Sequence, residues 1–113
     1  MRFEESLLSG STRLLVLSLL KDRDKYGYEM ITQLSLRSEN AFEMKEGTLY
    51  PLLHALEKED LLSSYEKETE SGRKRRYYHL TEKGVRELAA QRAQWQAFSA
   101  AVDKVVGAEI LAC

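Results

Sequence analysis

Apolar residues recur at helical spacing in the first half of the chain and predict three helices. Residues 4–21 carry leucines on more than one helix face, so we expect a largely buried helix that is interrupted or restarted near residues 10–12. Residues 25–38 form a second predicted helix, with Asp24 as its N-cap. Residues 46–60 form the third. The short connection between the second and third helices is typical of a helix-turn-helix.

The third predicted helix separates an apolar face from a polar one. Its buried face is marked by four leucines: Leu49, Leu52, Leu53 and Leu56. The other face carries Thr48, Pro51, His54 and Lys58. Because Pro51 lacks an N–H, it must lie near the start of the helix. Either Thr48 is the N-cap, or the first turn begins near Glu46 and one backbone hydrogen bond is lost.

Alternating apolar and polar residues predict strands on either side of the third helix. Phe42 and Met44 form a minimal strand before it. Residues 62–68 and 74–80 form two longer strands, and residues 69–73 (TESGR) supply turn chemistry between them. These two strands therefore predict a hairpin with a polar, basic tip.

The last predicted helix has an apolar stripe that its own domain cannot cover. Thr81 caps this helix, which runs from residue 82 to about 107. Leu88, Trp95 and Val102 are spaced by sevens, and so are Phe98 and Val105. So long a stripe indicates a partner subunit, and we expect a homodimer.

Together the elements predict a mainly α fold with a small β-hairpin (α+β). Residues 1–81 form a winged helix-turn-helix DNA-binding domain, and residues 82–113 form a C-terminal dimerisation helix. In such domains the third helix enters the major groove, and the hairpin tip reaches the adjacent backbone or minor groove.

Charge is uneven along the 113 residues. The net charge is −1, with about −3 on residues 1–60, +2 on residues 61–84 and 0 on the rest. A local basic patch on an acidic body is a candidate phosphate site. The patch consists of Arg73, Lys74, Arg75 and Arg76.

We expect Arg73, Lys74 and Arg75 to contact phosphates or the minor groove. Strand alternation puts Arg76 on the face of Tyr78 and Leu80, where it could instead support the core. A solvated charged turn is the alternative for the whole patch.

The start of the third helix carries side chains that can hydrogen-bond DNA. Thr48 and His54 can bond bases or phosphates, and Tyr50 can bond a phosphate. Together with Pro51, they are the expected recognition residues. The alternative for Tyr50 is a packing role.

Three segments resemble those of PadR-type transcriptional regulators. Residues 24–30 (DKYGYEM) resemble their second-helix motif, residues 46–53 (EGTLYPLL) their recognition-helix motif, and residues 71–84 (SGRKRRYYHLTEKG) their wing and following turn. The resemblance covers roughly residues 7–105. It implies a homodimeric bacterial regulator, usually a repressor, that dimerises through the last helix with help from the first. Asp60 and Glu66 depart from the glycine and tryptophan that many relatives carry there.

The same resemblance suggests a ligand. Some PadR-type proteins bind flat aromatic or cationic compounds between paired tryptophans at the dimer axis. Trp95 and Phe98 are the candidates here, and their alternative role is the dimer core.

Other function classes find little support. Cys113 is the only cysteine, which favours a reducing, cytoplasmic setting, and no stretch is long enough to span a membrane. We see no catalytic constellation, metal-ligand spacing or cofactor motif, so we expect no enzyme, metal or cofactor. We therefore expect a regulator that binds a palindromic operator in double-stranded DNA. Its rivals are a winged-helix module for protein partners and a small-molecule sensor without DNA binding.

Overall fold

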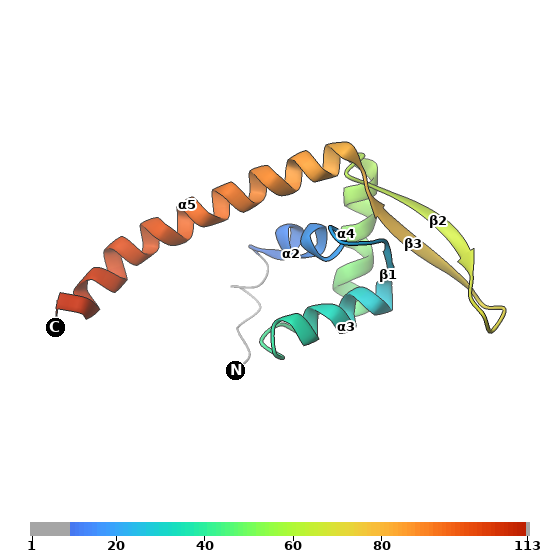
Figure 1. The fold of residues 1–113 in the computed structure, drawn as a ribbon, viewed down its shortest axis with the longest axis horizontal. Helices are drawn as coiled ribbons and strands as arrows, with labels where there is room; N and C mark the ends of the chain where they lie inside the picture. Colours follow the sequence, from blue (N-terminus) through green and yellow to red (C-terminus); the bar gives the residue numbers. More distant parts are fainter. Residues whose placement is uncertain (1–9, 113) are drawn as a thin grey trace.

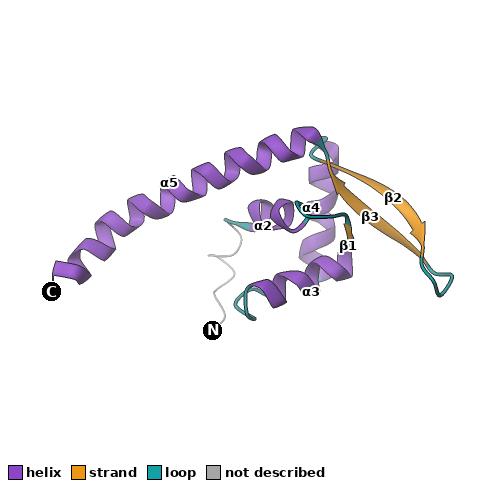
Figure 2. Cartoon of the chain, in the orientation of Figure 1, coloured by secondary structure: helices purple, strands orange, loops and turns teal. Residues whose placement is uncertain are grey.

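The computed structural model of the protein describes residues 10–112, and the side chains of residues 10–107, as four helices and three strands. Figures 1 and 2 show the order of these elements. In chain order they are α2 (Thr12–Leu19), β1 (Lys25–Tyr26), α3 (Gly27–Arg37), α4 (Glu46–Lys58), β2 (Leu62–Glu68), β3 (Lys74–Leu80) and α5 (Glu82–Ala112). The strands form one antiparallel sheet in the order β1-β3-β2. This is the α+β winged-helix architecture that the sequence predicts.

The body of the fold and the last helix differ in shape. Helices α2, α3 and α4 gather beside the sheet, whereas α5 runs away from them as a long arm (Figure 1). The arm makes the molecule elongated, with extents of 61 × 30 × 22 Å.

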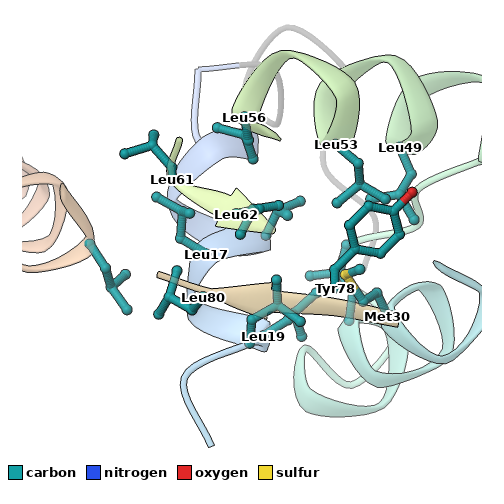
Figure 3. Packing of buried hydrophobic residues seen from close by; sticks show 14 of the residues in the cluster. Leu17, Leu19, Met30, Leu49, Leu53, Leu56, Leu61, Leu62, Tyr78 and Leu80 are labelled. Carbon is teal, nitrogen blue, oxygen red and sulfur yellow. The ribbon is translucent and has the colours of Figure 1, made fainter. Parts of the chain in front are cut away.

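The hydrophobic core lies between the helices and the sheet. Figure 3 shows leucines of α2 and α4 meeting Leu62 of β2 and Leu80 of β3, with Tyr78 and Met30 beside them. Each fully buried leucine contributes about 1.5–3 kcal/mol relative to an exposed one. The core therefore fixes the positions of α4 and of the base of the hairpin together.

Helix α4 follows its predicted pattern closely. Its apolar face is buried at Leu49, Leu53 and Leu56. The helix begins at Glu46, with Lys45 rather than Thr48 at the N-cap position. Pro51 consequently lies within the helix, and the backbone hydrogen bond that its N–H would have donated is lost.

The start of the second helix differs from the prediction. Helix α3 begins at Gly27, after Tyr26 at the N-cap position, and makes no side-chain cap hydrogen bond. Asp24 is therefore not its N-cap. Its carboxylate is bound instead by side chains of the hairpin, which are distant in sequence.

The short strand also lies elsewhere than predicted. Residues 41–45 form no strand. Met44 is buried and Phe42 packs against the core, while the Phe42 N–H donates to the Ser38 hydroxyl at 3.0 Å. The third strand is instead β1, in which Lys25 pairs with Tyr78 and Tyr26 with Tyr77.

The first and last helices have different bounds from those predicted. Within the described chain the first helix spans only Thr12–Leu19, after a turn at residues 10–11, and the predicted part at 4–9 lies outside the described residues. Helix α5 continues to Ala112 rather than ending near 107.

The predicted helix cap at Thr81 is confirmed. Its hydroxyl accepts a hydrogen bond from the Gly84 N–H at 3.0 Å and donates to the Asp60 carbonyl at 2.6 Å. Asp60 itself has a φ of 61°, a left-handed conformation that favours glycine, the residue that the PadR resemblance leads one to expect there.

Candidate nucleic-acid interface

One side of α4 is open to solvent along its whole length. Thr48, Pro51 and His54 are all exposed on this side, as the sequence predicts. Lys45 and Lys58 are exposed near its two ends. Sequence reasoning did not single out Lys45, because it precedes the helical pattern. The face therefore combines hydrogen-bonding groups with cations, a mixture that suits contact with bases and phosphates.

Tyr50 lies where α4 meets α3. A Cβ atom added at Gly27 would lie 2.7 Å from Cζ of Tyr50, so the Tyr50 ring packs directly against the start of α3. The side chain nevertheless remains 37% exposed. Packing and DNA contact are both compatible with this position, and Gly27 is the residue that permits the close approach.

The hairpin formed by β2, β3 and residues 69–73 is called the wing below. Its two strands pair from Leu62 with Leu80 out to Glu68 with Lys74. At the tip, the Gly72 N–H donates to the Thr69 carbonyl at 2.9 Å, and Gly72 has a φ of 82°. This left-handed turn projects Arg73 and Lys74 into solvent.

The predicted wing cations do not share one environment. Arg75 is partly buried, with its guanidinium carbon 4.3 Å from the centre of the Tyr26 ring. Arg76 is exposed and lies on the same face of β3 as Tyr78 and Leu80. Alternation along the strand thus predicted the side of Arg76 but not its exposure.

Arg76 belongs to a polar chain that joins the wing to α4. Its Nη1 donates to the Ser64 hydroxyl at 3.0 Å, and Ser64 donates to Oε2 of Glu57 at 2.7 Å. This link was invisible in the sequence because its members lie on three elements.

The opposite face of the wing carries a tyrosine cluster, formed by Tyr26, Tyr65 and Tyr77. The Tyr65 and Tyr77 rings stack with their centres 5.8 Å apart, and Tyr26 meets Tyr77 edge-on at 5.5 Å. The Lys67 ammonium lies 5.5 Å from the centre of the Tyr77 ring. Cation–π contacts of this kind stabilise by about 0.5–1 kcal/mol at exposed sites.

Asp24 lies at the edge of this cluster and binds both strands. The Tyr65 hydroxyl donates to Oδ2 at 2.7 Å, and Nδ1 of His79 lies 2.8 Å from Oδ1. Burial by itself raises the pKa of Asp24, but the hydrogen bonds from Tyr65 and His79 outweigh it, so this pKa lies below its usual value. Asp24 is consequently a carboxylate at neutral pH.

The predicted apolar stripe on α5 is exposed to solvent beyond its first residue, Leu88. Leu88 is buried against the body, but Trp95 is 47% exposed. The Trp95 and Phe98 rings lie with their centres 6.2 Å apart. Other large apolar side chains exposed on the same helix are Val85, Val102, Val105 and Val106.

A groove of about 440 Å³ lies between α2 and the first half of α5. Leu88 and Val85 supply apolar lining, whereas Lys21 and Arg92 bring positive charge to it. Trp95 does not line this groove.

Two other site classes find no support in the described part of the chain. No group of three or more histidine, cysteine or acidic side chains there could hold a metal ion. None of its helices is long and apolar enough to cross a membrane.

Comparison with known proteins gives a consistent result. The profile of the transcriptional regulator PadR-like family matches residues 16–90. An uncharacterised protein of Lysinibacillus sphaericus is 32% identical over 97 residues, which are 86% of this chain and 89% of that protein. The transcriptional regulator YqjI of Escherichia coli is 32% identical over 85 residues, or 75% of this chain, but these cover only 39% of YqjI.

Solved structures agree with the sequence matches. A transcriptional regulator from Clostridium thermocellum superposes with a TM-score of 0.81 at 29% identity, covering 89% of this chain and 98% of that one. A PadR-like regulator from Bacillus cereus superposes with a TM-score of 0.78 at 32% identity, covering 89% and 96%.

Proposed function

Because the chain belongs to the PadR-like family of transcriptional regulators, we propose that it is a homodimeric repressor of transcription. DNA binding is a property of this family, whose members are regulators and not enzymes. In the proposed dimer, two copies of α4 read the half-sites of a palindromic operator about one helical turn apart. Repression follows when the bound dimer occludes a promoter in the bacterial cytoplasm.

The observation that carries the proposal is the exposed polar side of α4 beside a basic wing. Thr48, Tyr50, Pro51 and His54 offer groups for base edges and phosphates. Arg73 and Lys74 extend the positive charge to the wing tip, and Arg75 stands behind them against Tyr26. The two regions are held together by the core and by the Glu57–Ser64–Arg76 chain.

The bare stripe of α5 supports the homodimer. From the buried Leu88 at the body, the stripe continues as one exposed apolar surface formed by Trp95, Phe98, Val102 and Val105. A second copy of α5 fits this surface, because apolar spacing by sevens is the pattern by which helices pack on each other. Such a surface left open would be an aggregation liability.

The first test is binding to the DNA upstream of the gene for this protein. A mobility-shift titration at several salt concentrations, with a competitor duplex, should give a specific complex of dimer stoichiometry that weakens as salt rises. Binding to a protein partner that is insensitive to salt, with no DNA complex even at low salt, would instead favour the winged-helix interaction module.

Single substitutions separate the two parts of the interface. His54→Ala should change the sequence preference, because α4 faces base edges. Arg73→Ala should weaken binding to all duplexes alike, because phosphate contacts carry no sequence information. A uniform loss for His54→Ala, or unchanged non-specific affinity for Arg73→Ala, would contradict these roles.

Trp95 makes a ligand response testable. We propose that a planar aromatic compound stacks on Trp95 and Phe98 at the dimer axis and releases the DNA by shifting the dimer geometry. A panel of such compounds should quench the fluorescence of Trp95, the only tryptophan. If no compound quenches it, or if ligand binds tightly to a protein without DNA affinity at low salt, release by this route is wrong.

A further inference from the structure

Both strands of the wing are tied to a single carboxylate outside the wing. Asp24 precedes β1 and accepts one hydrogen bond from Tyr65 of β2, while its other oxygen lies 2.8 Å from His79 of β3. Asp24 is partly buried, with 32% of its side chain exposed. No other described carboxylate binds side chains of both β2 and β3.

The sheet itself holds the wing over only a short distance. Strand β1 pairs through two residues, Lys25 and Tyr26, whereas β2 and β3 pair with each other through seven residues each. The outer part of the wing is therefore a two-stranded ribbon, and such a ribbon is marginal by itself. Side-chain contacts along its base must limit how far it swings.

Two sets of contacts meet that need from opposite faces. On one face, Arg76 and Ser64 reach Glu57 of α4. On the other face, the Asp24 carboxylate is hydrogen-bonded to Tyr65 and His79. The Arg75 guanidinium lies over the Tyr26 ring, which also meets the Tyr77 ring edge-on. Asp24 and Tyr26 flank Lys25, which is buried and bonded to the Leu19 carbonyl at 2.5 Å, so the second face is anchored in the core.

We infer that Asp24 is a positioning residue for DNA binding, which fixes the direction of the wing relative to α4 without touching DNA. The inference rests on the proposed function, because it requires Arg73 and Lys74 at the wing tip to contact phosphates. It also gives Arg75 a second role: stacked on Tyr26, it supports the wing that carries the other two cations.

The test compares variants of the full-length protein that remove one contact each. Asp24→Ala removes both anchors, Asp24→Asn keeps one acceptor oxygen, and Tyr65→Phe removes one hydroxyl while leaving the ring stack with Tyr77. Ser63→Ala is the matched control, because Ser63 is exposed on the same face of β2. Thermal unfolding confirms that each variant is folded, and Tyr65→Phe carries the test if Asp24→Ala does not fold.

The probe is a random-sequence DNA duplex of about 30 base pairs, long enough for two half-sites and their flanks. Wing contacts with phosphates do not depend on sequence, so no operator is needed. Affinity is measured by fluorescence anisotropy over a range of salt concentrations. The slope of log affinity against log salt reports the phosphate contacts, at roughly 0.9 per contact.

Asp24→Ala should weaken binding by roughly tenfold or more and reduce the slope by about 3.6, because two cations in each of the two protomers lose their places. Tyr65→Phe and Asp24→Asn should fall between it and the wild type, and Ser63→Ala should match the wild type. Arg73→Ala, which weakens binding in the wild-type background, should change it by less than about twofold in the Asp24→Ala background.

The outcomes separate this inference from the proposed function. If Arg73→Ala leaves the wild-type affinity and slope unchanged, the wing does not contact phosphates and the proposed DNA interface is wrong. If Arg73→Ala weakens binding equally with and without Asp24, the wing keeps its place and the positioning role is wrong, while the DNA interface stands. An unchanged salt slope in folded Asp24→Ala would overturn the inference in the same way.

Discussion

Helices α4 and α5 both carry a stripe of apolar residues at helical spacing, but the stripe of α4 is buried and most of that of α5 is exposed. In α4, Leu53 is fully buried by the other helices and the sheet. In α5, Trp95 and Val102 are 47% and 41% exposed, because the helix has already left the body. The same pattern thus builds a core where neighbours surround it and leaves an open surface where they do not.

The change occurs within α5 itself. At its base, Gly84 lies so close to the Leu61 carbonyl and to Leu80 that a side chain would not fit, and Leu88 is buried. From Trp95 onward the large side chains are exposed. The base of α5 is therefore part of the winged-helix body. The rest of the helix carries an apolar surface that the body does not cover.

The largest expected effect on stability concerns the buried stripe of α4. Leu53→Ala should lower the free energy of unfolding by about 2–5 kcal/mol, because it leaves a cavity in the core. Urea denaturation measures this change. Leu36→Ala, at a leucine of α3 that is 65% exposed, should change it by less than about 0.5 kcal/mol. Similar losses for the two variants would contradict the buried placement of α4.

The exposed stripe should respond through association instead. Val102→Asp brings one carboxylate per protomer to the proposed dimer surface and should weaken self-association by roughly 100-fold or more. Sedimentation equilibrium measures the dissociation constant. Ala97→Asp, on the other side of the exposed helix, should leave it nearly unchanged. Equal effects of the two charges would mean that the stripe is not the interface.

Two glycines, one at the base of α5 and one at the start of α3, lie in close contacts within the body of the fold. Gly84→Ala should destabilise the fold by about 1–3 kcal/mol, since a methyl group there meets the backbone of Leu61, which cannot give way easily. Gly27→Ala meets only the outer end of the Tyr50 ring, so it should cost less stability but reduce DNA affinity by moving Tyr50. Thermal unfolding and DNA anisotropy of both variants check the order, and a reversed order of stability would refute it.

The smallest expected effect concerns pH. Arg13 of α2 binds Glu59 with two hydrogen bonds of 2.9 and 3.0 Å, and these lower the pKa of Glu59 from its usual 4.5. The stabilisation is therefore complete above pH 4.5 and is lost as the pH falls through the lower, folded-state pKa.

Both side chains of this pair are more than one-third exposed, so the contribution should be about 0.5 kcal/mol or less. In urea denaturation from pH 6 to pH 3, the free energy of unfolding should fall slightly less for Glu59→Gln than for the wild type. An identical pH dependence of the two proteins would show that the Arg13–Glu59 pair does not contribute to stability.

Local patterns in the sequence were sufficient for α4 and the wing. The leucines of α4 and the alternation in residues 62–68 and 74–80 gave the bounds of α4 within two residues and those of both strands as observed. In each case the signal repeats within a few residues and agrees with its turn or cap. The winged-helix class followed from the order of elements.

Long-range contacts decided the parts that local patterns missed. Asp24 has the residue type of an N-cap, but Tyr65 and His79, 41 and 55 positions away, bind its carboxylate. Phe42 and Met44 alternate like a strand but are not part of any strand of the described chain, whereas Lys25 and Tyr26 lie beside β3. Such choices depend on which segments meet in space.

The candidate site was predicted unevenly for the same reason. Exposure of Thr48, Pro51 and His54 follows from the helical pattern alone. Strand alternation places Arg75 and Arg76 on opposite faces, but the stacking of Arg75 on Tyr26 is a tertiary contact that no spacing in the sequence reveals.

The single residue between β3 and α5 makes the arm a lever for the wing. Thr81 alone separates the two elements. Its backbone N–H donates to the Leu61 carbonyl and its hydroxyl to the Asp60 carbonyl, so the connection between wing and helix is rigid. Helix α5 has 31 residues, a length of about 46 Å. A tilt of 5° at the joint moves its far end by about 4 Å, and with that end held by a partner, the same tilt would redirect the wing. The two wing strands are seven residues long, about 23 Å, so the same 5° tilt would move the wing tip by about 2 Å, a third of the width of a DNA minor groove, about 6 Å. In the proposed dimer, a small adjustment between the two copies of α5 would therefore shift the two wings relative to the double helix.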